Sequence, residues 1–97
     1  MGKLVVSLDG VVIKEVQITK DKTTLGRRPY NDIVIDNLAV SGEHAVLQMV
    51  GADVFIEDLN STNGTFVNRT RVHPGQRRPL AVDYVIQIGT VQLKVKV

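Results

Sequence analysis

The chain has 97 residues, enough for one domain with a single hydrophobic core, and its apolar fraction of 43% is mostly valine, isoleucine and leucine. Its net charge of +2 comes from 12 basic and 10 acidic residues, a balance too even to predict a polyanion partner. The chain has no cysteine, which excludes disulfides and cysteine-ligated metals, and no apolar run approaches the ~20 residues of a membrane span. These properties favour a cytoplasmic domain without membrane contact.

Apolar and polar residues alternate with a period of two along much of the chain, and no stretch has helical periodicity of useful length. Residues 3–8 and 11–18 are predicted to be strands joined by a type I′ turn at Asp9-Gly10, because this pair tolerates positive φ values. Further short strands are expected over residues 23–27, 33–35, 44–50, 53–59, 65–67, 71–72, 79–80 and 84–89.

The alternation is clearest at the C-terminal end, where a strand is expected with one face in the core and the other in water. The core face would hold Val91, Leu93, Val95 and Val97, and the outer face Gln92, Lys94 and Lys96. About ten short strands without a helix predict an all-β fold, either a sandwich or a barrel. Because the chain has no repeat and no linker, residues 1–97 are expected to form one domain, of the kind that could be cut from a longer multidomain protein.

Three predicted loops, residues 28–32, 36–42 and 60–64, are expected to carry any function, because binding residues concentrate on the loops of a rigid scaffold. Arg27 stands directly before the first loop. Its planar guanidinium suits bidentate capture of a phosphate. The alternative is a surface arginine that pairs with a carboxylate such as Asp32.

Ser41 and His44 stand three residues apart where an apolar strand begins. A catalytic Ser–His pair is one alternative, but the pattern Gly-x-Ser-x-Gly is missing and no oxyanion-hole loop is evident, so no enzyme activity is predicted. Ser41 would instead bond a ligand oxygen or cap a turn. His44 is expected to point inward and to hold its loop through hydrogen bonds to the backbone.

The segment 58–68 places a cluster of small polar residues between two apolar runs. Taken alone, Asn63-Gly64 has an ordinary alternative as a hairpin turn that needs no ligand. Together with Arg27 and Ser41, the hydroxyls and the amide of this segment would form a pocket for a doubly charged oxyanion such as a phosphate.

The order and spacing of these pieces closely resemble the forkhead-associated (FHA) domain family. The matching segments are Leu25-Gly26-Arg27, Asn31-Asp32-Ile33, Val40-Ser41-x-x-His44-Ala45, residues 58–68 and Ile86-x-Ile88-Gly89. The resemblance extends from about Leu4 to Val97. It implies an eleven-stranded β-sandwich, the SMAD/FHA-like fold, whose loops at one end bind phosphothreonine peptides.

The resemblance also implies roles for single residues. Arg27 and Ser41 would hold the phosphate, Thr62 would contact the phosphothreonine region, and Asn63 would contact the peptide backbone. The residues that would shape the loops without touching the ligand are Gly26, His44, Gly64 and Asn68. The family implies neither a cofactor nor a metal.

Three positions depart from the family pattern. Gly42 stands where arginine or asparagine is frequent, Arg69 replaces a common glycine, and Asp83-Tyr84 replaces Gly-Asp. None of them removes a residue expected to contact the ligand, so we expect the domain to be competent for binding.

The sequence therefore predicts a non-catalytic module that recognises phosphothreonine-containing protein segments in Ser/Thr kinase signalling, with a loop pattern similar to that of bacterial members. The alternative is a phospho-independent interaction or assembly module on the same fold. Nucleic-acid binding is not predicted, because no stacking aromatics accompany the arginines of the segment 69–78. Those arginines, which would favour acidic residues beside the phosphothreonine or lie in solvent, are Arg69, Arg71, Arg77 and Arg78.

Overall fold

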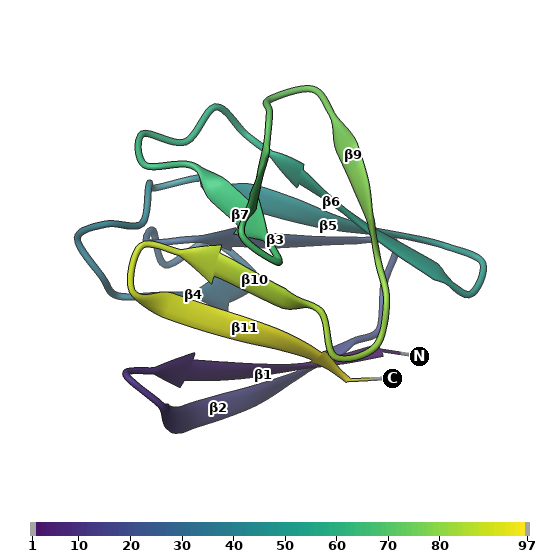
Figure 1. The fold of residues 1–97 in the computed structure, drawn as a ribbon, viewed down its shortest axis with the longest axis horizontal. Helices are drawn as coiled ribbons and strands as arrows, with labels where there is room; N and C mark the ends of the chain where they lie inside the picture. Colours follow the sequence, from purple (N-terminus) through teal and green to yellow (C-terminus); the bar gives the residue numbers. More distant parts are fainter. Residues whose placement is uncertain (1, 97) are drawn as a thin grey trace.

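The computed structural model describes residues 2–96, which form eleven strands and no helix (Figure 1). The strands are β1 (Gly2–Leu8), β2 (Val11–Ile18), β3 (Lys22–Gly26), β4 (Ile33–Val34), β5 (Ala45–Val50), β6 (Asp53–Asp58), β7 (Thr65–Val67), β8 (Thr70–Val72), β9 (Arg77–Leu80), β10 (Val85–Ile88) and β11 (Val91–Lys96). The all-β prediction is confirmed, and every strand begins and ends within two residues of its predicted bounds.

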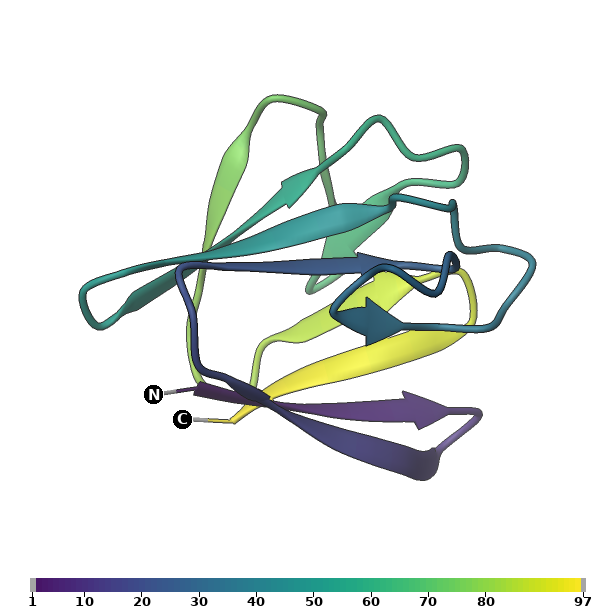
Figure 2. The same ribbon diagram turned by 180° about the vertical axis from the view of Figure 1, so that it is seen from behind.

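The strands form two sheets that pack face to face as a sandwich, and Figures 1 and 2 show its two layers from opposite sides. One sheet has six strands in the order β2-β1-β11-β10-β7-β8, and the other has five in the order β4-β3-β5-β6-β9. Neighbouring strands are antiparallel except for β3 and β4, which run parallel.

The core lies between the inner faces of the two sheets. Along β11, Val91, Leu93 and Val95 are buried whereas Gln92 and Lys94 are exposed, so the predicted alternation is confirmed; Val97 lies outside the described residues. Each fully buried aliphatic side chain stabilises the fold by about 1.5–3 kcal/mol relative to exposure. The largest of them are Leu4, Ile18, Leu25, Ile33, Leu47, Ile56, Ile86, Ile88 and Leu93.

Two hairpins close through residues with positive φ. Asp9 and Gly10 have φ values of 51° and 81° between the paired residues Leu8 and Val11, so the predicted turn is confirmed. A second turn, at Asn68-Arg69 with φ values of 48° and 71°, joins β7 to β8 and was not predicted. Arginine rarely adopts this left-handed conformation, so it gave no turn signal in the sequence.

The hairpin alternative for Asn63-Gly64 is wrong. β6 belongs to the five-stranded sheet and β7 to the six-stranded sheet, so the segment between them crosses from one layer to the other. This crossing leaves residues 59–64, which are mostly polar, outside any strand, at one end of the sandwich (Figure 2).

The pairing register brings the three motif loops to this same end, which we call the loop end. Leu25 pairs with Ala45, and Ala45 pairs with Asp58. The row continues past the strands, because the N–H of His44 donates to Leu25 O at 2.9 Å and the N–H of Leu59 donates to His44 O at 3.0 Å. The start of β1 and the end of β11 lie at the opposite end of the sandwich (Figure 1).

Candidate functional site

Arg27 follows the last residue of β3 and is exposed at the loop end. Its N–H donates to the carbonyl oxygen of Ser41 at 2.9 Å, which fixes its backbone to the second loop. The alternative pairing with Asp32 is wrong. Lys20 and then Thr24 donate to that carboxylate and hold the pKa of Asp32 below its usual value. Among residues 2–96 the Arg27 guanidinium forms no ion pair, so it can accept an anion.

Ser41 joins the second loop to the third. Its Oγ accepts a hydrogen bond from the N–H of Thr62 at 3.0 Å. Because this bond uses a lone pair of the oxygen, the hydroxyl hydrogen can still be donated to a ligand. Thr62 is itself exposed, so the structure brings Arg27, Ser41 and Thr62 together from three separate loops.

His44 is fully buried and holds the second and third loops together. Its Nδ1 accepts from the Ser41 N–H at 3.0 Å, so the ring proton lies on Nε2, which donates to Gly64 O at 3.0 Å. Burial lowers the pKa of His44 and favours this neutral form. The ring bonds the backbone of Ser41 and not its hydroxyl, so the geometry does not activate Ser41 as a nucleophile.

Asp58 organises the third loop, a role that the sequence reasoning missed. It is 2% exposed and accepts from Ser61 N at 3.0 Å, from Ser61 Oγ at 2.6 Å and from Thr65 Oγ1 at 2.6 Å. Burial alone would raise the pKa of Asp58, but the hydrogen bonds from Ser61 and Thr65 outweigh it and hold this pKa below its usual value. The spacing Asp-x-x-Ser was the available signal, because such side chains close local turns onto the backbone.

Asn31 was also missed. It is 6% exposed, and its Nδ2 donates to Arg28 O at 2.9 Å and to Gly42 O at 2.7 Å, which ties the first loop to the second. A β-carbon on Gly26 would collide with Gly42 O and would lie 2.6 Å from Asn31 Nδ2, so only glycine fits at position 26. No local sequence pattern predicts this contact, because Asn31 and Gly42 are 11 residues apart and belong to different loops.

Asn63 and Gly64 complete the third loop. Asn63 Nδ2 donates to Ala39 O at 2.9 Å, and the residue is otherwise exposed. Gly64 has a φ of 90°, a value that glycine adopts without strain. A β-carbon there would also lie 3.2 Å from Arg71 Nε. The loop therefore keeps its course only with a glycine at this position.

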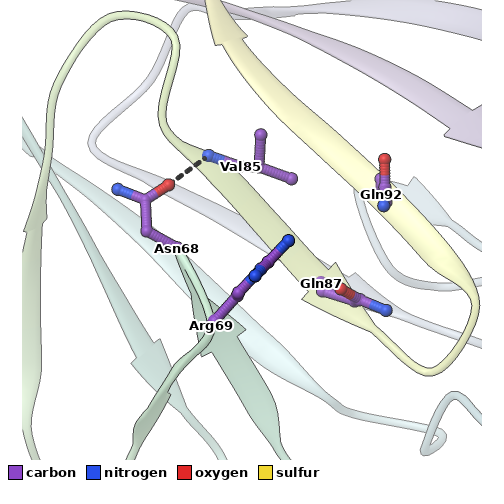
Figure 3. A pocket seen from close by; sticks show the side chains of 5 residues that line it. All are labelled: Asn68, Arg69, Val85, Gln87 and Gln92. Carbon is purple, nitrogen blue, oxygen red and sulfur yellow. Dashed lines mark hydrogen bonds between the residues drawn. The ribbon is translucent and has the colours of Figure 1, made fainter.

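Asn68 does not join the other site residues. It lies after β7, where its N–H donates to Val85 O at 2.9 Å and its Oδ1 accepts from Val85 N at 3.0 Å (Figure 3). It borders a groove of about 340 Å³ on the outer face of the six-stranded sheet. The residues that line this groove are Asn68, Arg69, Val85, Gln87 and Gln92.

The loop end therefore presents a guanidinium, two hydroxyls and an amide on a frame of buried hydrogen bonds, and such groups bind anions. Within residues 2–96, no group of three or more His, Asp or Glu side chains could hold a metal ion. In the same part of the chain no helix has the length and hydropathy to cross a membrane.

Comparison with known proteins identifies the family. The FHA domain family matches residues 23–89, and the chain belongs to the forkhead-associated (FHA) domain family. The glycogen accumulation regulator GarA of Mycolicibacterium smegmatis is 38% identical over 71 residues, which cover 73% of this chain and 43% of GarA. The oxoglutarate dehydrogenase inhibitor of Corynebacterium efficiens is also 38% identical over 71 residues, 73% of this chain and 48% of the inhibitor. The chain thus spans about half the length of these relatives.

Solved structures confirm the predicted sandwich. The FHA domain of FhaA, complexed with the intracellular domain of Rv3910, superposes with a TM-score of 0.88 at 29% identity and covers 99% of this chain and 100% of that domain. A structure from an analysis of phosphothreonine-dependent FHA domain interactions has a TM-score of 0.85 at 28% identity, over 98% of this chain and 96% of the other.

Proposed function

We propose that this domain is a non-catalytic module that binds phosphothreonine-containing protein segments in cytoplasmic Ser/Thr kinase signalling. One observation carries the proposal: Arg27, Ser41 and Thr62 come from three loops, yet hydrogen bonds hold them together, from Arg27 N–H to Ser41 O at 2.9 Å and from Thr62 N–H to Ser41 Oγ at 3.0 Å. All three offer hydrogen-bond donors to an incoming anion, and none has to be recruited from elsewhere in the fold.

The phosphate would be shared among these donors. The Arg27 guanidinium would donate hydrogen bonds to two phosphate oxygens, and the Ser41 and Thr62 hydroxyls would each donate one more. A phosphate carries about −1.5 to −2 charges and three acceptor oxygens at neutral pH. Each hydrogen bond to a charged group contributes about 1.5–3 kcal/mol, so a few of them separate phosphorylated from plain threonine by orders of magnitude.

The remaining site residues would position the peptide and the loops. Asn63 keeps its carbonyl oxygen and its second amide hydrogen for the peptide backbone, since one amide hydrogen is bonded to Ala39 O. Gly26, His44 and Gly64 would keep the loops in place, and Asn68 would brace the β7–β8 turn against β10.

Relatives support this reading. The inhibitor and regulator relatives are named for control of other proteins or processes. One similar structure comes from work on phosphothreonine-dependent FHA interactions, and another FHA domain is bound to the intracellular domain of Rv3910. These are properties of those proteins, and we extend them to this chain on the strength of the loop geometry.

Fluorescence anisotropy with four versions of one peptide tests the proposal. The phosphothreonine version should bind, and the threonine, glutamate and phosphoserine versions should bind far more weakly. Arg27→Ala should lower the affinity at least tenfold without unfolding the domain, given about 1.5–3 kcal/mol per charged hydrogen bond. Arg27→Lys should restore it only in part, because an ammonium lacks the planar fork.

Solution conditions give a further check. Binding should weaken as the pH falls through about 6, where the phosphate dianion gains a proton. It should depend only moderately on salt, whereas a duplex DNA control that bound would show a much steeper dependence. Equal affinity for phosphorylated and plain threonine would favour a phospho-independent interaction module instead.

A further inference from the structure

Arg28, which follows Arg27 in the sequence, is a second exposed arginine at the loop end. Its side chain runs across Gly42. A β-carbon placed on Gly42 would lie 2.9 Å from Arg28 Nε, 3.0 Å from its Cγ and 3.3 Å from its Cδ. The missing side chain at position 42 therefore leaves the space that the Arg28 side chain occupies.

The base of the Arg28 side chain is fixed. Arg28 N–H donates to Gly42 O at 3.3 Å, and Arg28 O accepts from Asn31 N at 3.1 Å and from Asn31 Nδ2 at 2.9 Å. Since Arg27 N–H donates to Ser41 O in the same way, successive arginines are bonded to successive residues of the second loop. The backbone of Arg28 is thus bonded to Gly42, the residue that follows Ser41, whose hydroxyl is proposed to hold the phosphate.

No carboxylate of the described chain neutralises Arg28. The ion pairs within residues 2–96 are Lys3–Glu15, Lys20–Asp32 and Lys96–Asp83, and none of them includes Arg28. Glu43 follows Gly42 directly and is exposed without pairing to Arg28. A positioned guanidinium with no internal partner is suited to an anion supplied by a ligand.

We propose that Arg28, seated on Gly42, selects a second anionic side chain close to the phosphothreonine in the bound segment. The shared chemistry is a pair of anionic oxygens, from either a carboxylate or a second phosphate. This inference rests on the proposed phosphothreonine function and adds a preference to it. The phosphate itself stays with Arg27, Ser41 and Thr62.

Arg71 provides an internal comparison. It lies on β8 against the third loop, where a β-carbon on Gly64 would come within 3.2 Å of its Nε and 3.3 Å of its Cζ. Like Arg28 it is exposed and takes part in no ion pair of the described residues. A preference produced by general positive charge at the loop end would depend on Arg71 as much as on Arg28.

The test uses phosphothreonine peptides with neutral flanks, with one glutamate moved through each flanking position, and with a phosphoserine at the best of those positions. We expect glutamate at one position to raise the affinity about threefold to fivefold, as for an exposed ion pair, and the second phosphate to raise it about tenfold or more. Arg28→Ala should abolish both gains and leave the affinity for the neutral peptide within about twofold.

Gly42→Ala tests the seating of Arg28 without removing its charge. Position 42 does not have a positive φ, and the nearest atoms to its new β-carbon belong to the flexible Arg28 side chain, so the fold should survive while the guanidinium moves. This variant should also lose the acidic preference. Lys22→Ala, at the opposite end of β3, removes one charge as the matched control and should keep the preference.

The possible failures are distinguishable. If no phosphothreonine peptide binds the wild-type domain, the proposed function falls. If the neutral phosphothreonine peptide binds but glutamate at every position leaves the affinity unchanged, only the role of Arg28 is overturned. A preference that survives Arg28→Ala and disappears in Arg71→Ala would overturn it equally.

Discussion

Replacement of His44 by alanine should destabilise the domain more than any substitution of a residue that faces the ligand. The change removes a fully buried ring and leaves Ser41 N–H and Gly64 O without their partner. Leaving a buried polar group unpaired costs about 1–3 kcal/mol, and the cavity adds a further cost. We expect a loss of about 3–5 kcal/mol, a large fraction of the ~5–15 kcal/mol typical of a native domain.

Urea and thermal unfolding of the unliganded domain measure this loss. For a domain of this size 1 kcal/mol corresponds to about 4–8 °C, so the Tm should fall by at least about 12 °C. His44→Asn is the informative partner, because its Oδ1 can still accept from Ser41 N–H while the side chain is too short to reach Gly64. The Tm of His44→Asn should lie between those of the wild type and His44→Ala.

Ser41→Ala is the control on the ligand side. It loses one partly exposed hydrogen bond, from Thr62 N–H, so it should cost only about 0.5–1.5 kcal/mol of stability. Per unit of lost stability, Ser41→Ala should lose more phosphopeptide affinity than His44→Ala. A His44→Ala domain as stable as wild type would refute the reasoning that the imidazole bonds hold the loops.

Three further predictions concern the loops and turns. Gly26→Ala should lower the free energy of unfolding by at least about 1–3 kcal/mol and abolish peptide binding, because the new β-carbon would collide with Gly42 O. Urea unfolding identical to that of the wild type would contradict this close contact. Arg69→Gly should raise the Tm by a few degrees, because Arg69 has a φ of 71° and this left-handed conformation costs a non-glycine residue about 1–2 kcal/mol. An unchanged Tm would show that contacts of the Arg69 side chain offset this backbone strain. The free energy of unfolding should fall as the pH drops below 6.5, the usual pKa of histidine, because burial keeps the pKa of His44 lower in the fold and the unfolded chain then binds the extra proton. His44→Asn should remove this loss of stability. A second loss below about pH 4 should remain in that variant, because the pKa of Asp58 is also lowered in the fold.

The alternation of apolar residues was sufficient to predict the strands and an all-β fold, because each sheet buries one face, whereas the choice of a sandwich over a barrel came from the family resemblance. It could not predict which sheet a strand joins. Asn63-Gly64 had the composition of a hairpin turn, but β6 and β7 pair with different neighbours, and that choice depends on contacts remote in sequence. The strand over residues 11–18 was predicted correctly, although Val11, Val12 and Ile13 are 64%, 58% and 54% exposed at the sheet edge.

The candidate ligand contacts came from motif spacing and family resemblance, and the strand register places their loops together. The residues that hold those loops were harder to find. Asn31 bonds a carbonyl in a different loop, so its partner is visible only in the folded chain. Asp58 acts locally through Ser61 and Thr65, and its spacing to Ser61 was a usable signal that was overlooked.

The two ends of the described chain lie side by side. Lys3 pairs with Lys96 across β1 and β11, at the opposite end of the sandwich from the loops (Figures 1 and 2). Anything joined to either end would therefore emerge behind the domain, and the loops would face outward from it. Tethering to a surface, a resin or another polypeptide should leave the ligand's approach unobstructed. Any mechanical or conformational signal between an attached body and the loops would have to travel through the sandwich, whose longest dimension is 33 Å.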